Sequence, residues 1–193
     1  MTALGVARVL QRRLASYYEL EQAPCITDFM VVAQPGERET LLLRQTDDSV
    51  EMQLVVPECE LHDALVPSRL SDTYLQVAEG VSHFVFLCER IRTGLPTSHL
   101  ELELQAEVDK LVLLSDASRA TRRHATLHRE LYERVRFLHP ENSETGTRYR
   151  MANNLAARFT KRLSSLEPSH RRRQLMTFYR SGLTDKLRLA QAA

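Results

Sequence analysis

Glycine is scarce in this sequence, with six residues among 193. Loops that wrap backbone amides around a phosphate need several closely spaced glycines, and the sequence contains neither a Walker motif nor a dinucleotide-binding motif. The Gly-x-Ser-x-Gly turn of serine hydrolases is also missing. The sequence therefore disfavours ATP-dependent, NAD-dependent and serine-hydrolase activities.

Cysteines and long apolar runs are also few. The three cysteines, Cys25, Cys59 and Cys88, have no paired spacing, which argues against a secreted disulfide scaffold. The longest apolar run, residues 84–88, is far shorter than the roughly 20 residues of a membrane-spanning helix. We therefore expect a cytoplasmic protein without a membrane partner.

Residues 1–18 do not have the pattern of a signal peptide, because Arg8, Arg12 and Arg13 interrupt any apolar core. Their Arg-rich amphipathic pattern leaves a transit peptide as an alternative. The acidic residues Glu19 and Glu21 follow immediately and oppose that alternative.

Charge is divided unevenly along the chain. Residues 1–118 hold 9 Lys/Arg and 19 Asp/Glu, a balance of −10, whereas residues 119–193 hold 17 and 6, a balance of +11. Only three basic residues are lysines, and arginine binds phosphate and carboxylate through a planar fork that lysine lacks. This asymmetry indicates an anionic partner for the basic part, although codon usage alone also explains an arginine bias.

Hydrophobic spacing predicts an α+β protein in one domain, residues 1–193, with no cofactor required for folding. A helix over 3–20 precedes strands over 26–33, 39–45 and 50–56, which predict a three-stranded antiparallel meander. A connector over 57–71 leads to a bundle of about five helices. The predicted subregions are 1–57, with the helix and meander, and 72–182, with the bundle.

Capping residues and apolar spacing place the helices of the bundle. Ser71 is the predicted cap of the first, and Ser98 with Glu101 forms a predicted capping box for the second. The third begins at Ser118 and ends before Pro140. We expect four of its apolar residues to face inward: Leu127, Leu131, Val135 and Leu138. The fourth covers about 148–163, and the fifth runs from Pro168 to about Arg180.

The last two predicted helices carry a candidate anion-binding surface. Several positive side chains on one rigid face are what phosphate or carboxylate binding needs. The candidate residues are Arg150, Arg158, Lys161, Arg162, Arg171, Arg172 and Arg173. Three aromatic residues nearby, Tyr149, Phe178 and Tyr179, are candidates for stacking on bases. Alternatively, these arginines face water without a partner, or pair internally with the acidic stretch 101–109.

A candidate metal site rests on histidines at helical spacing. His124 and His128 are four residues apart, as are Glu79 and His83, so each pair shares a helical face. Glu107 lies at the level of His83 in a predicted antiparallel hairpin. Such a cluster suits a divalent transition metal in a helical bundle, whereas the alternative is a set of structural histidines.

One spacing has a family resemblance. Arg119 with His124, and Arg134 with His139, each have the form Arg-x4-His, which resembles the ribonuclease motif of HEPN domains. The resemblance implies metal-free RNA cleavage by a paired arginine and histidine in a small helical bundle. The polar residue that commonly follows the motif arginine is replaced by Ala120 and Val135, and the predicted sheet is foreign to a minimal HEPN bundle.

The connector contains a further group of ligand-type residues, residues 58–63, with Cys59 and His62. A single Cys-x2-His without a second pair is weak evidence for zinc, and no partner base identifies Cys59 as a nucleophile. We interpret this stretch as a polar loop.

These observations favour a non-catalytic binding or regulatory protein, whose Arg-rich C-terminal surface holds an anionic protein or a nucleic acid. The alternatives are a helical metal-dependent enzyme with a His/Glu site and a HEPN-like ribonuclease. An adaptor between proteins is a further possibility, which needs an exposed apolar patch.

Overall fold

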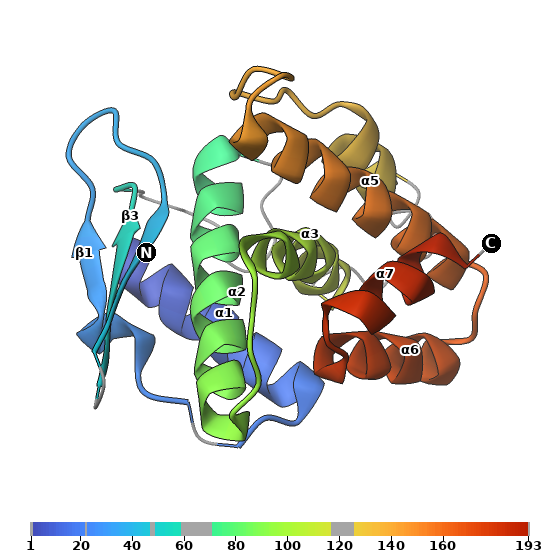
Figure 1. Cartoon of the computed structure of the whole chain (residues 1–193), viewed down its shortest axis with the longest axis horizontal. Helices are drawn as coiled ribbons and strands as arrows, with labels where there is room; N and C mark the ends of the chain where they lie inside the picture. Colours follow the sequence, from blue (N-terminus) through green and yellow to red (C-terminus); the bar gives the residue numbers. More distant parts are fainter. Residues whose placement is uncertain (1, 22, 47–48, 59–70, 117–125, 193) are drawn as a thin grey trace. The chain divides into compact units, whose positions relative to one another are not determined.

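The computed structural model describes residues 2–21, 23–46, 49–58, 71–116 and 126–192 (Figure 1). The described part is mixed α+β, as predicted, with mostly helical structure and one three-stranded sheet. The chain forms two compact units, Met1–Glu89 and Arg90–Ala193, and the boundary falls inside a helix. Each unit is described in turn.

The sheet of the first unit is mixed rather than antiparallel. Its strands are β1 (Met30–Val32), β2 (Thr40–Gln45) and β3 (Val50–Val56), in the order β1-β3-β2. Strands β2 and β3 form the predicted antiparallel hairpin, with Leu43 opposite Met52. Strand β1 pairs in parallel with β3, with Val31 opposite Val55. The prediction of an antiparallel meander was therefore wrong for the first strand.

The start of β1 explains this departure. Residues 26–28 form a 3-10 helix, η1 (Ile26–Asp28), instead of the first part of a strand. The Gln11 side chain holds this turn, because its amide donates to the Pro24 carbonyl at 2.7 Å and accepts from the Ile26 amide at 3.1 Å. The chain thus enters the sheet beside β3, where the Leu54 amide donates to the Phe29 carbonyl at 2.8 Å.

Two helices accompany the sheet in this unit. Helix α1 (Ala3–Tyr18) buries Val6, Leu10 and Leu14, the spacing that predicted it. Helix α2 (Asp72–Thr93) begins at its predicted cap, where the Ser71 hydroxyl accepts from the Tyr74 amide at 3.1 Å.

Gly80 lets α2 approach the strands closely. A Cβ atom at this position would lie 2.8 Å from Glu39 Cγ and 2.9 Å from Leu54 Cδ1. A side chain of any size therefore conflicts with the packing of α2 against β3 and the residue before β2.

The second unit is helical. Its described elements are α3 (His99–Asp116), the π-helical turn η2 (Arg129–Glu133), α5 (Glu144–Leu163), α6 (Pro168–Arg180) and α7 (Leu183–Gln191). Helix α3 packs on α5, α5 contacts η2 and α7, and α6 contacts α7. Helix α7, which was not predicted, follows Gly182. In Figure 1, α5 is orange and α6 and α7 are red, whereas α3 is yellow-green.

The third predicted helix differs most from expectation. Its beginning at Ser118 lies outside the described residues. Residues 126–128 are helical, but η2 follows, and Arg134 leaves the helical conformation with φ −112° and ψ 19°. Leu131 is buried, whereas Val135 is 37% and Leu138 is 64% exposed, so the inward assignment of these two residues was wrong. Pro140 disfavours helix in the residue before it, and residues 134–139 accordingly form no helix.

Candidate anion-binding site

Helix α3 carries carboxylates that are buried inside the protein. Burying a carboxylate is costly unless a cation pairs with it, and the three buried glutamates of α3 each have a basic partner. The pairs in the second unit are Arg90–Glu101, Arg148–Glu103 and Lys110–Glu107, with nitrogen–oxygen distances of 2.6, 3.8 and 2.8 Å. These two arginines and this lysine are therefore used internally. Only Arg148 belongs to the basic stretch 119–193, and none of the three is a predicted anion-binding residue.

The predicted capping box at the start of α3 is formed only in part. The Ser98 hydroxyl accepts from the Glu101 amide at 3.2 Å, as expected. The Glu101 carboxylate binds Arg90 instead of closing the box, and the Arg90 guanidinium also donates to the Ser181 carbonyl.

Lys186 on α7 is a further buried cation, and the sequence analysis did not identify it. Its Nζ donates to Gln105 Oε1 at 2.5 Å, and the Gln105 amide donates to Asp109 Oδ1 at 2.8 Å. Burial lowers the pKa of Lys186 to about 7, with Arg90 acting in the same direction and Glu101 and Asp109 opposing it. A lysine among Leu183, Leu187 and Ala190 is the signal that could have indicated it.

The predicted anion-binding residues lie on the outer side of α5 and α6. Arg158 and Lys161 on α5 and Arg173 on α6 are exposed. Within the described residues, no hydrogen bond or ion pair joins the side chain of any of these three to another residue. Their positive charges therefore face solvent. Arg172 on α6 is also exposed, but it has an interaction within the protein.

Three other predicted residues bind neutral backbone carbonyls. Arg171 donates to the Leu163, Ser164 and Leu166 carbonyls at 3.1–3.3 Å and so closes the end of α5. Arg162 donates to the Ala192 carbonyl at 2.6 Å. A carbonyl fixes a guanidinium in place without neutralising it, so these arginines keep their charge for a partner.

Arg150 is the most firmly held of these arginines. It donates twice to the His139 carbonyl, at 3.1 Å each, and once to the Gly146 carbonyl at 3.0 Å. Its guanidinium also lies 4.7 Å from the centre of the Phe137 ring. The segment before α5 therefore presents this guanidinium in one orientation.

An open groove of about 540 Å³ runs beside Arg150. Its lining residues are Glu141 and a stripe of α5 at helical spacing: Thr147, Arg150, Met151, Asn154, Leu155 and Arg158. We call this feature the α5 groove. The sequence analysis found its arginines but not Met151 and Leu155, although two apolar residues four positions apart among polar ones were the available signal.

The three aromatic residues that were candidates for stacking on bases have other contacts in the structure or are buried. Phe178 and Tyr179 are buried, and Phe178 stacks on Phe159 with ring centres 4.2 Å apart, so neither is available to stack on bases. The Tyr149 ring stacks on His139 at 5.6 Å.

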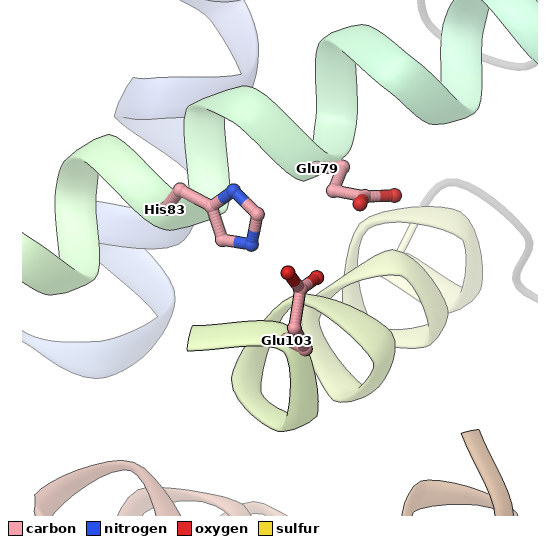
Figure 2. A group of neighbouring side chains, drawn as sticks. All are labelled: Glu79, His83 and Glu103. Carbon is pink, nitrogen blue, oxygen red and sulfur yellow. The ribbon is translucent and has the colours of Figure 1, made fainter. Parts of the chain in front are cut away.

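The candidate metal ligands are divided between the two units. In the first unit, Glu79 and His83 lie one turn apart and extend from the same side of α2, as their spacing predicted (Figure 2). His83 Nδ1 also lies 3.4 Å from Glu39 Oε1, and both side chains are buried. The third labelled residue, Glu103, belongs to α3 of the second unit, where it pairs with Arg148.

The other predicted ligands have partners within the second unit. His128 Nε2 lies 3.0 Å from the Ala157 carbonyl, and its ring packs edge-on against Tyr132. Glu107 pairs with Lys110, and its carbonyl accepts from the Tyr132 hydroxyl at 2.9 Å. His124 lies outside the described residues. His128 and Glu107 therefore each have contacts within the protein, and their assignment as metal ligands stays a prediction.

The remaining candidates offer no assembled site in the described part of the chain. Arg134 and His139 are exposed, and the His139 ring stacks on Tyr149. Arg119, Cys59 and His62 lie outside the described residues.

None of the described helices combines the length and the apolar composition that crossing a bilayer requires. Comparison of the chain with protein families, with curated proteins and with solved structures gave no match in any of the three.

Proposed function

We propose that this protein is a non-catalytic, cytoplasmic binding or regulatory protein that holds an anionic partner, an acidic protein or a nucleic acid, on the outer basic residues of α5 and α6. One observation carries the proposal: the basic residues of the second unit include an inner set that is paired with carboxylates and an outer set that is exposed. Arg90, Arg148 and Lys110 pair with carboxylates of α3. Arg158, Lys161 and Arg173 are exposed and pair with no other described residue.

Electrostatics supports an anionic ligand for the outer set. Residues 119–193 carry a balance of +11, and the inner pairs do not involve these outer side chains. Exposed positive charges on rigid helices attract anions over several ångströms and release counterions when they bind. Arg150 and Arg171, fixed by backbone carbonyls, add oriented donors to the same surface.

The test is binding of two labelled anions, an oligothymidylate and a glutamate-rich peptide of equal formal charge, followed by fluorescence anisotropy. The key variant carries Arg158→Glu, Lys161→Glu and Arg173→Glu. We expect the wild-type protein to bind at least one probe, and the variant to bind it about tenfold or more weakly, because three contacts become repulsive.

A matched control carries Arg8→Glu, Arg12→Glu and Arg44→Glu, which change the net charge equally through exposed residues of the first unit. Its affinity should stay within about twofold of wild type. Equal losses in the two variants would show that only total charge matters, and failure of the wild-type protein to bind either probe would remove the proposal.

A second candidate function, metal-dependent chemistry, is favoured by the shared face of Glu79 and His83 (Figure 2). Metal-ligating histidines commonly place their other ring nitrogen against a carboxylate, and Glu39 lies 3.4 Å from His83 Nδ1. Elemental analysis of protein equilibrated with zinc tests this candidate. Stoichiometric zinc that is lost in Glu79→Gln and His83→Ala supports it, whereas a metal-free protein, or zinc retained in both variants, rules it out.

A further inference from the structure

We infer that the α5 groove is the binding site for an acidic amphipathic peptide segment of a protein partner. This inference rests on the proposed function and deepens it, because it chooses between the two classes of anion and names the part of the surface that recognises it.

The two charges of the groove are spaced for a helical or extended segment. Arg150 and Arg158 are eight residues apart on α5, which corresponds to about 12 Å along the helix axis. Neither has a carboxylate partner among the described residues. Carboxylates placed about two helical turns apart on a partner segment match this spacing and bind arginine through paired hydrogen bonds.

Between these charges the groove is lined by two apolar residues, Met151 and Leu155, and by the polar Asn154. Met151 is 45% exposed, and Leu155 forms the adjacent wall. Methionine adapts its shape to a partner and is common on surfaces that bind amphipathic helices. A ligand that satisfies this surface therefore carries apolar side chains as well as negative charge.

The groove is organised before binding. Three hydrogen bonds to carbonyls and the Phe137 ring hold the Arg150 guanidinium. A side chain that is already ordered loses little conformational entropy when a carboxylate binds it, which favours a specific contact over a diffuse one.

Nucleic acid fits the groove less well, because the aromatic residues nearby are engaged in other contacts. Binding of single strands relies on aromatic rings that stack on bases, but among the described residues Phe178 and Tyr179 are buried and the Tyr149 ring stacks on His139. An exposed methionine between two arginines favours the peptide.

The experiment uses a labelled helical peptide with two glutamates about two turns apart that flank two leucines on one face. The control peptide has the same composition with the glutamates moved to the opposite face, and a labelled oligothymidylate is the third probe. Affinities are measured by anisotropy for the wild-type protein, Met151→Ala, Arg158→Glu and Arg8→Glu, with circular dichroism to verify folding.

We expect the wild-type protein to bind the patterned peptide at least about fivefold more tightly than the control peptide. The affinity for the patterned peptide should fall about fivefold or more in Met151→Ala and in Arg158→Glu, and should stay unchanged in Arg8→Glu. Equal binding of the two peptides, or unchanged binding by folded Met151→Ala, overturns the inference. Binding of the oligothymidylate alone overturns it while leaving the proposed function intact. Binding of no probe overturns both.

Discussion

The Arg150 guanidinium donates two hydrogen bonds of 3.1 Å to the backbone carbonyl of His139, eleven residues earlier in the chain. This contact fixes the irregular segment before α5 against the helix and orients a positive charge beside the α5 groove. Because the acceptor is neutral, the arginine performs a structural role and still presents its charge.

Gly146 makes this contact possible, and its replacement provides a test. A Cβ at this position would lie 1.9 Å from the Pro140 carbonyl oxygen, which belongs to the backbone and cannot move aside. We predict that Gly146→Ala destabilises the protein by about 1–3 kcal/mol in urea unfolding, despite the better helix propensity of alanine. Lys161→Ala, on an exposed position of the same helix, should change stability by less than about 0.5 kcal/mol. Similar values for the two variants would show that the close approach is not required.

The buried pair of Arg90 and Glu101 supports a second stability prediction. Both side chains are almost fully buried, with a 2.6 Å nitrogen–oxygen distance. We expect Arg90→Ala to cost about 3–5 kcal/mol, because it leaves a buried carboxylate without its cation. Arg158→Ala, which removes an exposed arginine, should be close to neutral. An Arg90→Ala protein as stable as wild type would mean that water or another cation compensates Glu101.

Lys186 predicts a pH dependence of stability. Its pKa is about 7 in the folded protein, well below the ordinary value of 10.5, so between these values the unfolded chain binds more protons than the folded one. Stability should therefore rise with pH from about 7 towards 10, by on the order of a few kcal/mol, and be lowest where Lys186 is charged in both states. Unfolding free energies measured from about pH 6.5 to 9.5 test this.

The companion variant for that measurement is Lys186→Met, which keeps the length of the side chain but does not titrate. The rise of stability with pH should disappear in this variant. An equally steep rise in both proteins would assign the effect to other groups.

Much of the helical structure was predictable because it depends on local spacing. Val6, Leu10 and Leu14 marked α1, and Ser71 marked the start of α2. The position of β1 in the sheet was not predictable, because alternating side chains indicate a strand but not the strand that pairs with it. Here β1 pairs with β3, and the Gln11 hydrogen bonds to Pro24 and Ile26 hold the turn that leads into it.

The same distinction applies to the candidate site. The sequence indicated the basic stripe of α5 and α6, since charge and period are visible in it. It did not indicate which arginines bind backbone carbonyls, because the acceptors of Arg150 and Arg171 have no side-chain signature. Nor did it show that Leu138 is exposed, since the helical period continues past the point where the helix ends at Arg134.

The most direct test of the account is the salt dependence of binding to the glutamate-rich peptide. We compare the wild-type protein with a variant that carries Arg158→Gln, Lys161→Gln and Arg173→Gln, over a range of sodium chloride concentrations. The account predicts that wild-type affinity falls steeply as salt rises, and that the variant binds more weakly with a flatter dependence. An affinity that stays constant from low to high salt, or an identical dependence in the two proteins, would contradict the claim that these outward-facing side chains hold an anionic partner.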